Sequence, residues 1–293
     1  MKFYLIAVAA LMLSFLLNPV PLLSQETPDD TIEVPPPKVR KYSLGNPVPD
    51  RRLRDLSPDR PDYTESPITV DAGRAQIETD FVLFDFGGNF FDEDRPVYLD
   101  NVVVLNNIIK VGLSQQVDMQ LVLPLLSFRE EQLDSQTQLS MNFVPAAGLR
   151  FKFNLVGNNG SKFALGVMPY GIVDLLRSED QLEDVGIAVP VSYRLSQDVS
   201  IGAMGTAHGK PGKTFFTDHS LSVSFPILND FDLKGFGEVV TSFWYEEYEW
   251  HYSANAGIIY QPVKDIIIDA GAFVGLTELM PGLNVFTGVT FRL

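Results

Sequence analysis

The stretch Asp59–Pro67, "DRPDYTESP", brings together within one short segment the side chains of this sequence that could do chemistry. Two carboxylates flank a guanidinium, and a hydroxyl and a third carboxylate follow. Close carboxylates can act as an acid–base pair, and a guanidinium can hold a carboxylate through two parallel hydrogen bonds. An active-site loop is one interpretation, and an electrostatic anchor is the other. Because the segment contains no histidine and no activated nucleophile, we predict no catalytic residue in it.

Two further patterns suggest chemistry but lack the context for it. "AHGKPGKT" at residues 207–214 resembles a phosphate-binding loop, but strand-like "FFTDHSLSVSF" follows where such a loop opens a helix. The three histidines show no metal-ligand spacing. His219 and Ser220 are neighbours, so on a strand they point to opposite faces and cannot act together. We therefore expect no enzyme, no cofactor and no metal site.

The composition limits the function further. The 293 residues include 22 Lys and Arg against 37 Asp and Glu. This acidic balance argues against nucleic acid as a partner, because phosphate neutralisation needs a basic surface. The chain has no cysteine, which excludes disulfides, thiolate metal ligands and a lipid anchor on an amino-terminal cysteine.

The first 24 residues have the features of a secretory signal. Lys2 precedes the apolar stretch 3–17, and "NPVPLLS" leads to a cleavage point after Ser24. A transmembrane anchor is the alternative, but the apolar stretch is shorter than the roughly 20 residues that span a bilayer. We predict a cleaved signal peptide over 1–24 and export of the chain.

Residues 25–58 contain seven prolines and no apolar periodicity. Such a composition buries too little apolar surface to offset the entropy of ordering. We predict a flexible periplasmic tail over 25–58, followed by a short segment over 59–73 at the mouth of the next domain. We call residues 59–73 the pre-barrel segment.

From residue 74 onward, apolar residues alternate with polar or small ones. In "GLRFKFNL" at 148–155, the leucines and phenylalanines share one face, and Arg150, Lys152 and Asn154 share the other. This period of two predicts β-strands. Twelve such segments begin near residues 74, 98, 118, 142, 162, 184, 198, 217, 232, 250, 265 and 283.

The connections between these segments distinguish two all-β folds. Short connections such as "SQQV" and "QPVK" alternate with longer, often acidic ones such as "SFREEQLDSQTQLS" and "DLLRSEDQLE". A soluble sandwich has no reason for this alternation, whereas an outer-membrane barrel has tight periplasmic turns and long outer loops. We predict an all-β fold, an up-and-down antiparallel transmembrane β-barrel of about 12 strands over 74–293, in the outer membrane of a Gram-negative bacterium.

The segment "DRPDYTESPITVDAGRAQIETDF" and the later "IIKVGLSQQVDMQLVLPLL" resemble a family of outer-membrane transporters linked to the phenol meta-cleavage pathway. The resemblance covers roughly 59–293, and its distinctive part is the first 70 residues of that range. It implies transport of aromatic or other small hydrophobic compounds. The matching residues are Asp59, Arg60, Pro61, Asp62, Thr64, Glu65, Ser66, Pro67, Gly73, Glu78, Gly112, Leu113 and Asp118.

The polar face of the strands is the predicted pore lining. Both charge signs occur there, so the side chains either line a thin aqueous channel or cross-link into a closed core. We expect Arg60 to pair with Asp59, Asp62 or a lumen carboxylate and to order the pre-barrel segment, for which a plain polar turn is the alternative. The predicted pore-lining residues are Gln76, Glu78, Asp80, Asp118, Gln120, Arg150, Lys152, Asn154, Arg194, Asp269 and Arg292, and those of the pre-barrel segment are Asp59, Arg60, Asp62, Thr64 and Glu65.

The function predicted from these features is a passive channel or transporter for small molecules. The alternative is a structural or adhesive barrel with a closed lumen and acidic surface loops. Expected partners are outer-membrane lipid, lipopolysaccharide, the barrel-assembly machinery and a small solute. The carboxylates of "YEEYEW" at 245–250 either form a solvated loop or hold divalent cations that bridge lipopolysaccharide phosphates.

Overall fold

The structure is a computed structural model that describes residues 42–87, 98–123, 125–133, 136–144, 146–176, 181–228, 232–277, 280 and 282–293. The predicted signal peptide (1–24) and residues 25–41 of the predicted tail lie outside the described residues. Across the described part of the chain, no helix is long and apolar enough to cross a membrane.

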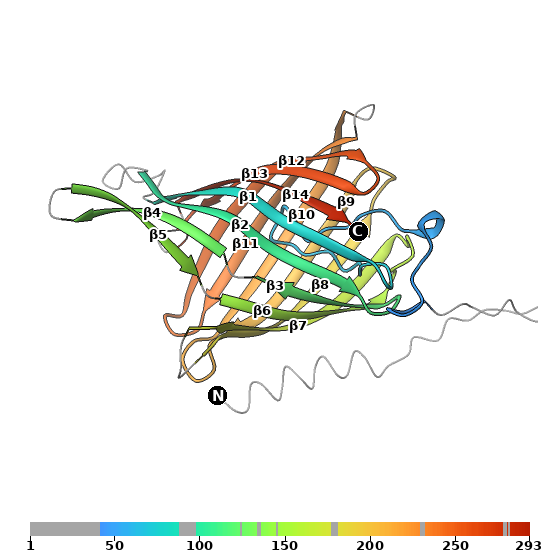
Figure 1. Cartoon of the computed structure of the whole chain (residues 1–293), viewed down its shortest axis with the longest axis horizontal. Helices are drawn as coiled ribbons and strands as arrows, with labels where there is room; N and C mark the ends of the chain where they lie inside the picture. Colours follow the sequence, from blue (N-terminus) through green and yellow to red (C-terminus); the bar gives the residue numbers. More distant parts are fainter. Residues whose placement is uncertain are drawn as a thin grey trace, which may run out of the picture. The chain divides into compact units, whose positions relative to one another are not determined.

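The described residues form one antiparallel sheet of fourteen strands that closes on itself (Figure 1). β1 pairs with both β2 and β14, which closes the sheet into a barrel, and among the described strands β5 pairs with β4 alone. The strands are β1 (Ala75–Gly87), β2 (Tyr98–Gly112), β3 (Val117–Val122), β4 (Leu125–Leu133), β5 (Gln136–Val144), β6 (Ala146–Val156), β7 (Phe163–Asp174), β8 (Leu182–Arg194), β9 (Ser200–Gly209), β10 (Phe216–Leu228), β11 (Leu233–Trp244), β12 (Glu249–Val263), β13 (Ile266–Gly275) and β14 (Leu283–Arg292).

Two pairs of strands share a position in the barrel wall. β3 and β4 pair one after the other with the same strand, β2. On their other side, β6 pairs with β3 and β5 pairs with β4. The fourteen strands of the described chain are therefore twelve positions in a closed barrel, which confirms the predicted fold and strand number.

The stretch 127–140 was expected to be a long loop, and that expectation is wrong. It lies in the β4–β5 hairpin, which projects from one end of the barrel (Figure 1). The polar sequence "SFREEQLDSQTQLS" shows no apolar alternation, but strand pairing uses backbone groups that every residue except proline carries. A hairpin that extends beyond the barrel wall needs no apolar face, so the alternation signal is absent there.

The two ends of the barrel differ in their connections. At one end, which we call the turn end, the strands are joined by 113–116, 195–199 and 264–265. At the other, the loop end, the connections include 88–97, 175–181 and 276–282. The carboxyl terminus lies at the turn end, together with residues 42–58 (Figure 1).

The barrel reverses the pattern of a soluble protein. Its fully buried side chains include Lys110, Lys152 and Glu78, whereas its outer face exposes large apolar ones such as Leu221, Val239 and Ile268. Soluble proteins rarely expose apolar surface that continues around the molecule. An apolar exterior around a polar interior matches a barrel whose outer face contacts lipid.

Residues 42–58 differ from the flexible tail expected over 25–58. Val48 and Leu56 are buried. Arg54 donates through Nε to Asp71 at 2.7 Å, and through its other nitrogens to the carbonyls of Thr69 and Asn158, each at 2.9 Å. Backbone hydrogen bonds from Leu44 to Leu113 and from Val48 to Ala72 add to these contacts. Such contacts need no apolar periodicity, so the composition of the segment does not reveal them.

Candidate functional site in the barrel lumen

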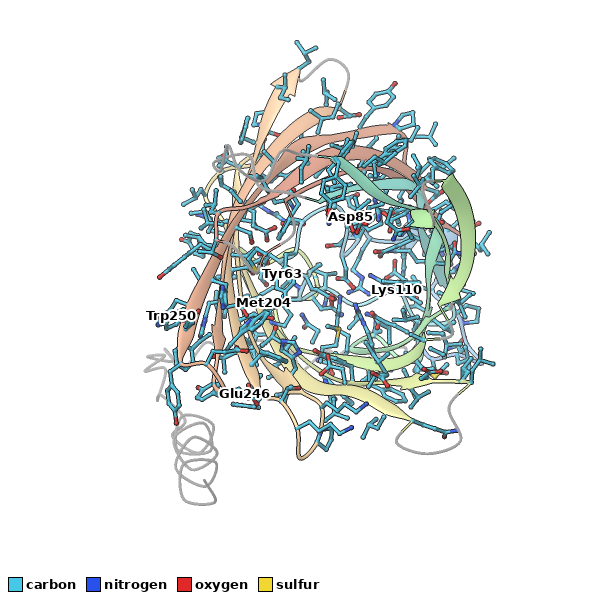
Figure 2. All side chains as sticks on the ribbon, turned by 90° about the vertical axis from the view of Figure 1, so that its left-hand side faces the viewer. Tyr63, Asp85, Lys110, Met204, Glu246 and Trp250 are labelled. Atoms are coloured by element: carbon cyan, nitrogen blue, oxygen red, sulfur yellow. The ribbon has the colours of Figure 1, made fainter. Side chains whose placement is uncertain are left out.

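The pre-barrel segment lies inside the barrel. Its residues bond to the inward faces of β1, β2, β3, β6, β10, β11 and β13, which together lie around most of the wall. Only a segment within the lumen can contact all of these strands. Figure 2, in which the loop end faces the viewer, shows Tyr63 and Lys110 within the ring of strands.

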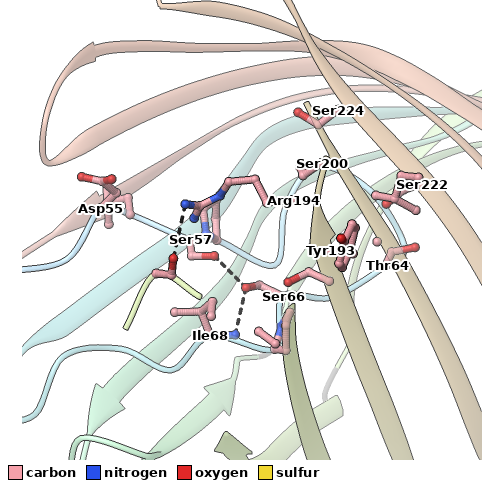
Figure 3. A pocket seen from close by; sticks show the side chains of 18 of the residues that line it. Asp55, Ser57, Thr64, Ser66, Ile68, Tyr193, Arg194, Ser200, Ser222 and Ser224 are labelled. Carbon is pink, nitrogen blue, oxygen red and sulfur yellow. Dashed lines mark hydrogen bonds between the residues drawn. The ribbon is translucent and has the colours of Figure 1, made fainter. Parts of the chain in front are cut away.

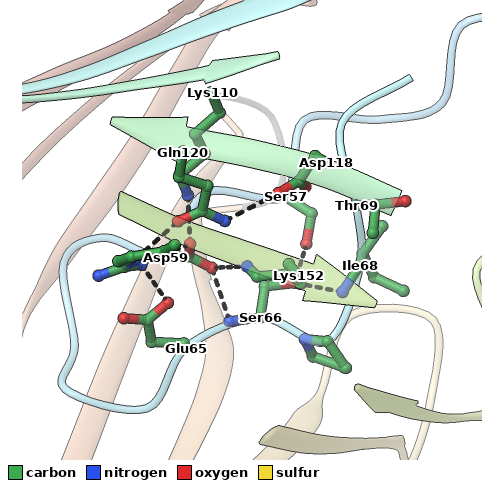
Figure 4. A network of polar contacts seen from close by, with 12 residues as sticks. Ser57, Asp59, Glu65, Ser66, Ile68, Thr69, Lys110, Asp118, Gln120 and Lys152 are labelled. Carbon is green, nitrogen blue, oxygen red and sulfur yellow. Dashed lines mark hydrogen bonds and ion pairs between the residues drawn. The ribbon is translucent and has the colours of Figure 1, made fainter. Parts of the chain in front are cut away.

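Asp59 is the centre of a buried charge cluster (Figure 4). Its carboxylate accepts from the ammonium groups of Lys110 on β2 and Lys152 on β6, and from Arg150 Nη2 at 3.4 Å. Its backbone N–H donates to the Glu78 carboxylate at 3.1 Å. Burial alone would raise the pKa of Asp59, but the three cations hold it well below its usual range. Asp59 is therefore an ionised anchor.

Arg150 extends this cluster along the wall. It donates to Glu65 at 2.6 Å and to the side-chain oxygen of Gln120 at 2.9 Å. Gln120 in turn donates to Asp118 at 3.0 Å, and Asp118 accepts from the backbone N–H of Val70 at 2.9 Å. The predicted lumen residues of β3 and β6 thus bind both ends of the pre-barrel segment.

Arg60 forms a second anchor. It pairs with Asp80 on β1, and its Nη2 and Nε donate to Asp269 on β13 at 2.7 and 3.3 Å. Its Cζ lies 5.9 Å from the centre of the Phe286 ring. Position 288 must be glycine for this arrangement, because a Cβ there would collide with Arg60 Nη2 and would lie 2.5 Å from the Thr79 carbonyl oxygen.

Glu238 on β11 forms a third anchor, which the sequence analysis missed. It accepts from the backbone N–H groups of Tyr63 and Thr64, each at 2.7 Å, and from the Thr64 hydroxyl at 2.6 Å. The Tyr63 hydroxyl donates to Asp218 on β10 at 2.5 Å. The sequence does mark this residue, because Glu238 is the charged residue on a strand face that it shares with the apolar Phe236 and Val240.

The structure places the predicted pore-lining residues in three groups. Most contact the pre-barrel segment directly or through a neighbour, including Asn154, which donates to the Pro67 carbonyl at 2.8 Å. Arg292 lies at the turn end, where it donates to Asp265 at 2.5 Å and to the Arg54 carbonyl at 2.8 Å. Arg194 is exposed at the end of β8 and donates to the Gly160 carbonyl at 3.4 Å, outside the buried network.

Two cavities lie on either side of the pre-barrel segment. The turn-end cavity, of about 730 Å³, is rich in hydroxyls such as Ser57, Ser200 and Ser222 (Figure 3). The inner cavity, of about 390 Å³, is lined by Met168, Ala188 and other residues of the wall. Three residues line both cavities, namely Arg60, Asp62 and Glu65. We call these three residues the septum.

Asp62 differs from the other two septum residues in its surroundings. It accepts a hydrogen bond from Ser222, and among the described residues no cation lies within ion-pair distance of it. Burial, together with the nearby Glu238 carboxylate, raises the pKa of Asp62 to about 7. Its charge therefore changes near neutral pH.

In the part of the chain that the structure describes, no group of three or more His, Asp or Glu residues is arranged to hold a metal ion. The network instead consists of paired charges and hydrogen bonds between the segment and the wall.

No family model matches the chain, and no curated protein matches it. Among solved structures, it is similar to a KdgM porin, with 10% identity over 74% of this chain and 98% of that chain at a TM-score of 0.45. It is also similar to an anion-selective porin from Comamonas acidovorans (6% identity, 74% and 98% coverage, TM-score 0.37) and to OccK11 of Pseudomonas aeruginosa (8% identity, 75% and 95% coverage, TM-score 0.37). These likenesses concern the barrel architecture alone, and the resemblance to the phenol-pathway transporters stays a prediction.

Proposed function

We propose that this protein is an outer-membrane channel through which small molecules diffuse passively. The observation that carries the proposal is the pair of lumen cavities that meet at Arg60, Asp62 and Glu65 inside a closed barrel. The apolar exterior supports a place in a lipid bilayer, and the polar interior supports an aqueous path. The predicted signal peptide supports export to that membrane.

The cargo implied by the family resemblance is aromatic or otherwise hydrophobic. One feature of the lumen supports an apolar component in the solute. Met168, Ala188 and Met204 form a buried apolar cluster on the inward faces of β7, β8 and β9, and all three line the inner cavity. A lumen that carried inorganic ions alone would need no such surface.

Planar-bilayer recording tests the channel directly. The purified full chain, inserted from detergent, should give reproducible conductance steps, and the same preparation should change its migration in a gel on boiling, as folded barrels do. A preparation that shows the heat-dependent shift yet gives no steps over many insertions would overturn the channel. A chain that stays monomeric and soluble without detergent would overturn the membrane barrel itself.

The alternative function, a structural or adhesive barrel with a closed lumen, is supported by one observation. Asp59 is held by three cations from the wall, which is the cross-linking that a closed core needs. The absence of conductance steps would favour this alternative. Reproducible steps whose ion selectivity changes when Arg150 and Lys152 are reversed in charge would exclude it.

The outer partners stay predictions. Contact with lipid is expected from the apolar exterior, whereas binding to lipopolysaccharide and to the barrel-assembly machinery rests on the sequence. In the 245–248 turn, Glu246 accepts from the backbone N–H of Phe215 at 2.8 Å. At least one of the loop carboxylates therefore links this turn to the connection between β9 and β10.

A further inference from the structure

We infer that the lumen is selective for small organic cations, with the charged end of the solute at Asp62 and its apolar part against Met168, Ala188 and Met204. This inference rests on the proposed channel function and deepens it, because it names the class of solute that the septum and the inner cavity fit together. It follows from which charges near the septum are already paired and which are not.

The cations of the septum region are engaged by the wall and by the segment. Arg60 pairs with Asp80 and Asp269. Arg150 pairs with Glu65 and Asp59. None of these guanidinium groups is left to attract an anion in the passage.

Lys110 and Lys152 are buried and pair with carboxylates as well. Lys110 contacts Asp59 and Glu78, and Lys152 contacts Asp59. The cations of the turn-end cavity nearest to solvent, Lys162, Arg194 and Lys234, are exposed, so water and salt screen them. Among the described residues of the septum, the charge without an ion-pair partner is the negative charge of Asp62.

Glu238, which comes from β11, strengthens this negative potential most. Asp59 contributes less, because three cations compensate its charge, and Glu65 lines the same cavities but pairs with Arg150. Ser222 of β10 donates its hydroxyl to Asp62. A carboxylate that has an uncharged donor and carboxylate neighbours has an unmet requirement for a cation.

Titratable groups of the inner cavity wall are paired with one another. Asp184 on β8 lies 3.1 Å from His208 Nδ1, and it accepts from the Tyr170 hydroxyl at 3.2 Å. His208 Nε2 lies 2.9 Å from Asp218. This chain of contacts supplies no free cation to Asp62 and leaves Asp62 as the available charge between the cavities.

The wall of the inner cavity indicates the chemistry of the uncharged part of the solute. Met168 and Ala188 are 1% and 2% exposed, and with Met204 they form an apolar patch that shares the inner cavity with Asp62. Thioether side chains adapt to apolar groups of varied shape. An ammonium with a short alkyl chain can pair with Asp62 and also pack against the apolar patch. An inorganic cation can pair with Asp62 only, and Asp62 repels a carboxylate.

The raised pKa of Asp62, about 7, adds a pH dependence. Above pH 7 the carboxylate is charged and attracts cations, and below pH 7 it becomes neutral and loses this attraction. Burial also raises the pKa of Glu65 to about 7, so the second carboxylate of the septum loses its charge over the same range and contributes to the same change. Cation selectivity should therefore increase between pH 6 and pH 8.

The test is single-channel recording of the full chain in planar bilayers under a KCl gradient. At pH 8 the reversal potential should show preference for K⁺ over Cl⁻. Added n-hexylammonium should interrupt the current at lower concentration than methylammonium does, and hexanoate should not interrupt it. Asp62→Asn should bring the K⁺ to Cl⁻ permeability ratio close to one and raise the effective n-hexylammonium concentration about tenfold, which corresponds to about 1.4 kcal/mol.

Two controls separate the parts of the inference. Glu247→Gln removes an exposed carboxylate of the 245–248 turn. It should leave the K⁺ to Cl⁻ permeability ratio and the effective n-hexylammonium concentration unchanged. Met204→Ser should weaken the n-hexylammonium effect and leave the permeability ratio as it was. If Asp62→Asn does not fold, the change in selectivity from pH 8 to pH 6 serves in its place, measured in Glu65→Gln so that Asp62 is the septum carboxylate that still titrates.

The outcomes distinguish this inference from the channel proposal. Conductance with equal selectivity in the wild type and in Asp62→Asn overturns the cation inference and leaves the channel standing. Equal effects of n-hexylammonium and methylammonium overturn the apolar part. The absence of any conductance overturns the channel and this inference together.

Discussion

Arg60 Nη2 lies 2.7 Å from Asp269 Oδ1, although the two residues are 209 positions apart in the sequence. Asp269 lies on β13, and the other carboxylate partner of Arg60, Asp80, lies on β1. One guanidinium thus holds the pre-barrel segment to strands on both sides of β14, close to where the first and last strands close the barrel.

Arg60→Ala should loosen the pre-barrel segment. Removing one partner of a buried ion pair costs roughly 3–5 kcal/mol, because the remaining charges lose their compensation. We expect faster proteolysis between residues 55 and 70 and larger single-channel conductance, measured by mass spectrometry of limited digests and by bilayer recording. Arg51→Ala, at an exposed arginine of the same amino-terminal region, is the matched control. If both variants behave like the wild type, Arg60 does not anchor the segment.

The charge cluster around Asp59 should show strong coupling. Lys152→Met removes a buried cation from Asp59 and should lower the temperature at which the barrel loses its folded gel mobility. Asp59→Asn with Lys152→Met should be less destabilised than the sum of the two single variants, by roughly 0.5–3 kcal/mol. Strict additivity would show that the two side chains do not interact as described.

Much of this fold could be predicted from the alternation of residues, and the exceptions have physical causes. The inward position of Asp80 and Asp118 follows from the strand period, and their burial agrees with it. Lys110 was not among the predicted pore-lining residues. It stands in the apolar run "NIIKVG", where one charged residue does not show which face of the strand points into the lumen. The sequence could not identify Asp80 and Asp269 as the partners of Arg60. The alternation of residues shows which face of a strand a residue is on, but not which residue it meets across the lumen.

Gly288→Ala tests the space that Arg60 occupies. A Cβ at this position would collide with the guanidinium and with the Thr79 carbonyl, so the variant should lose heat stability and gain protease sensitivity over 55–70. Gly205→Ala places its Cβ in open space and should change neither property. In the Arg60→Ala background, Gly288→Ala should cost less than it does alone. An equal cost in both backgrounds would mean that the strand contact, and not Arg60, explains the effect.

Glu238→Gln should move the pH dependence of the channel. After burial itself, the Glu238 carboxylate is the largest cause of the raised pKa of Asp62. A neutral amide keeps one acceptor oxygen, which can still accept from the Thr64 N–H and hydroxyl, and it loses the acceptor of the Tyr63 N–H. It also removes the negative charge, so the pKa of Asp62 should fall below 7. Because Asp62 then stays ionised at lower pH, cation selectivity should persist to lower pH in Glu238→Gln than in the wild type. The measurement is the pH midpoint of the K⁺ to Cl⁻ permeability ratio, with Glu247→Gln as the charge-matched control. An unchanged midpoint, or one that moves to higher pH, would show that Glu238 does not act on Asp62 through its charge.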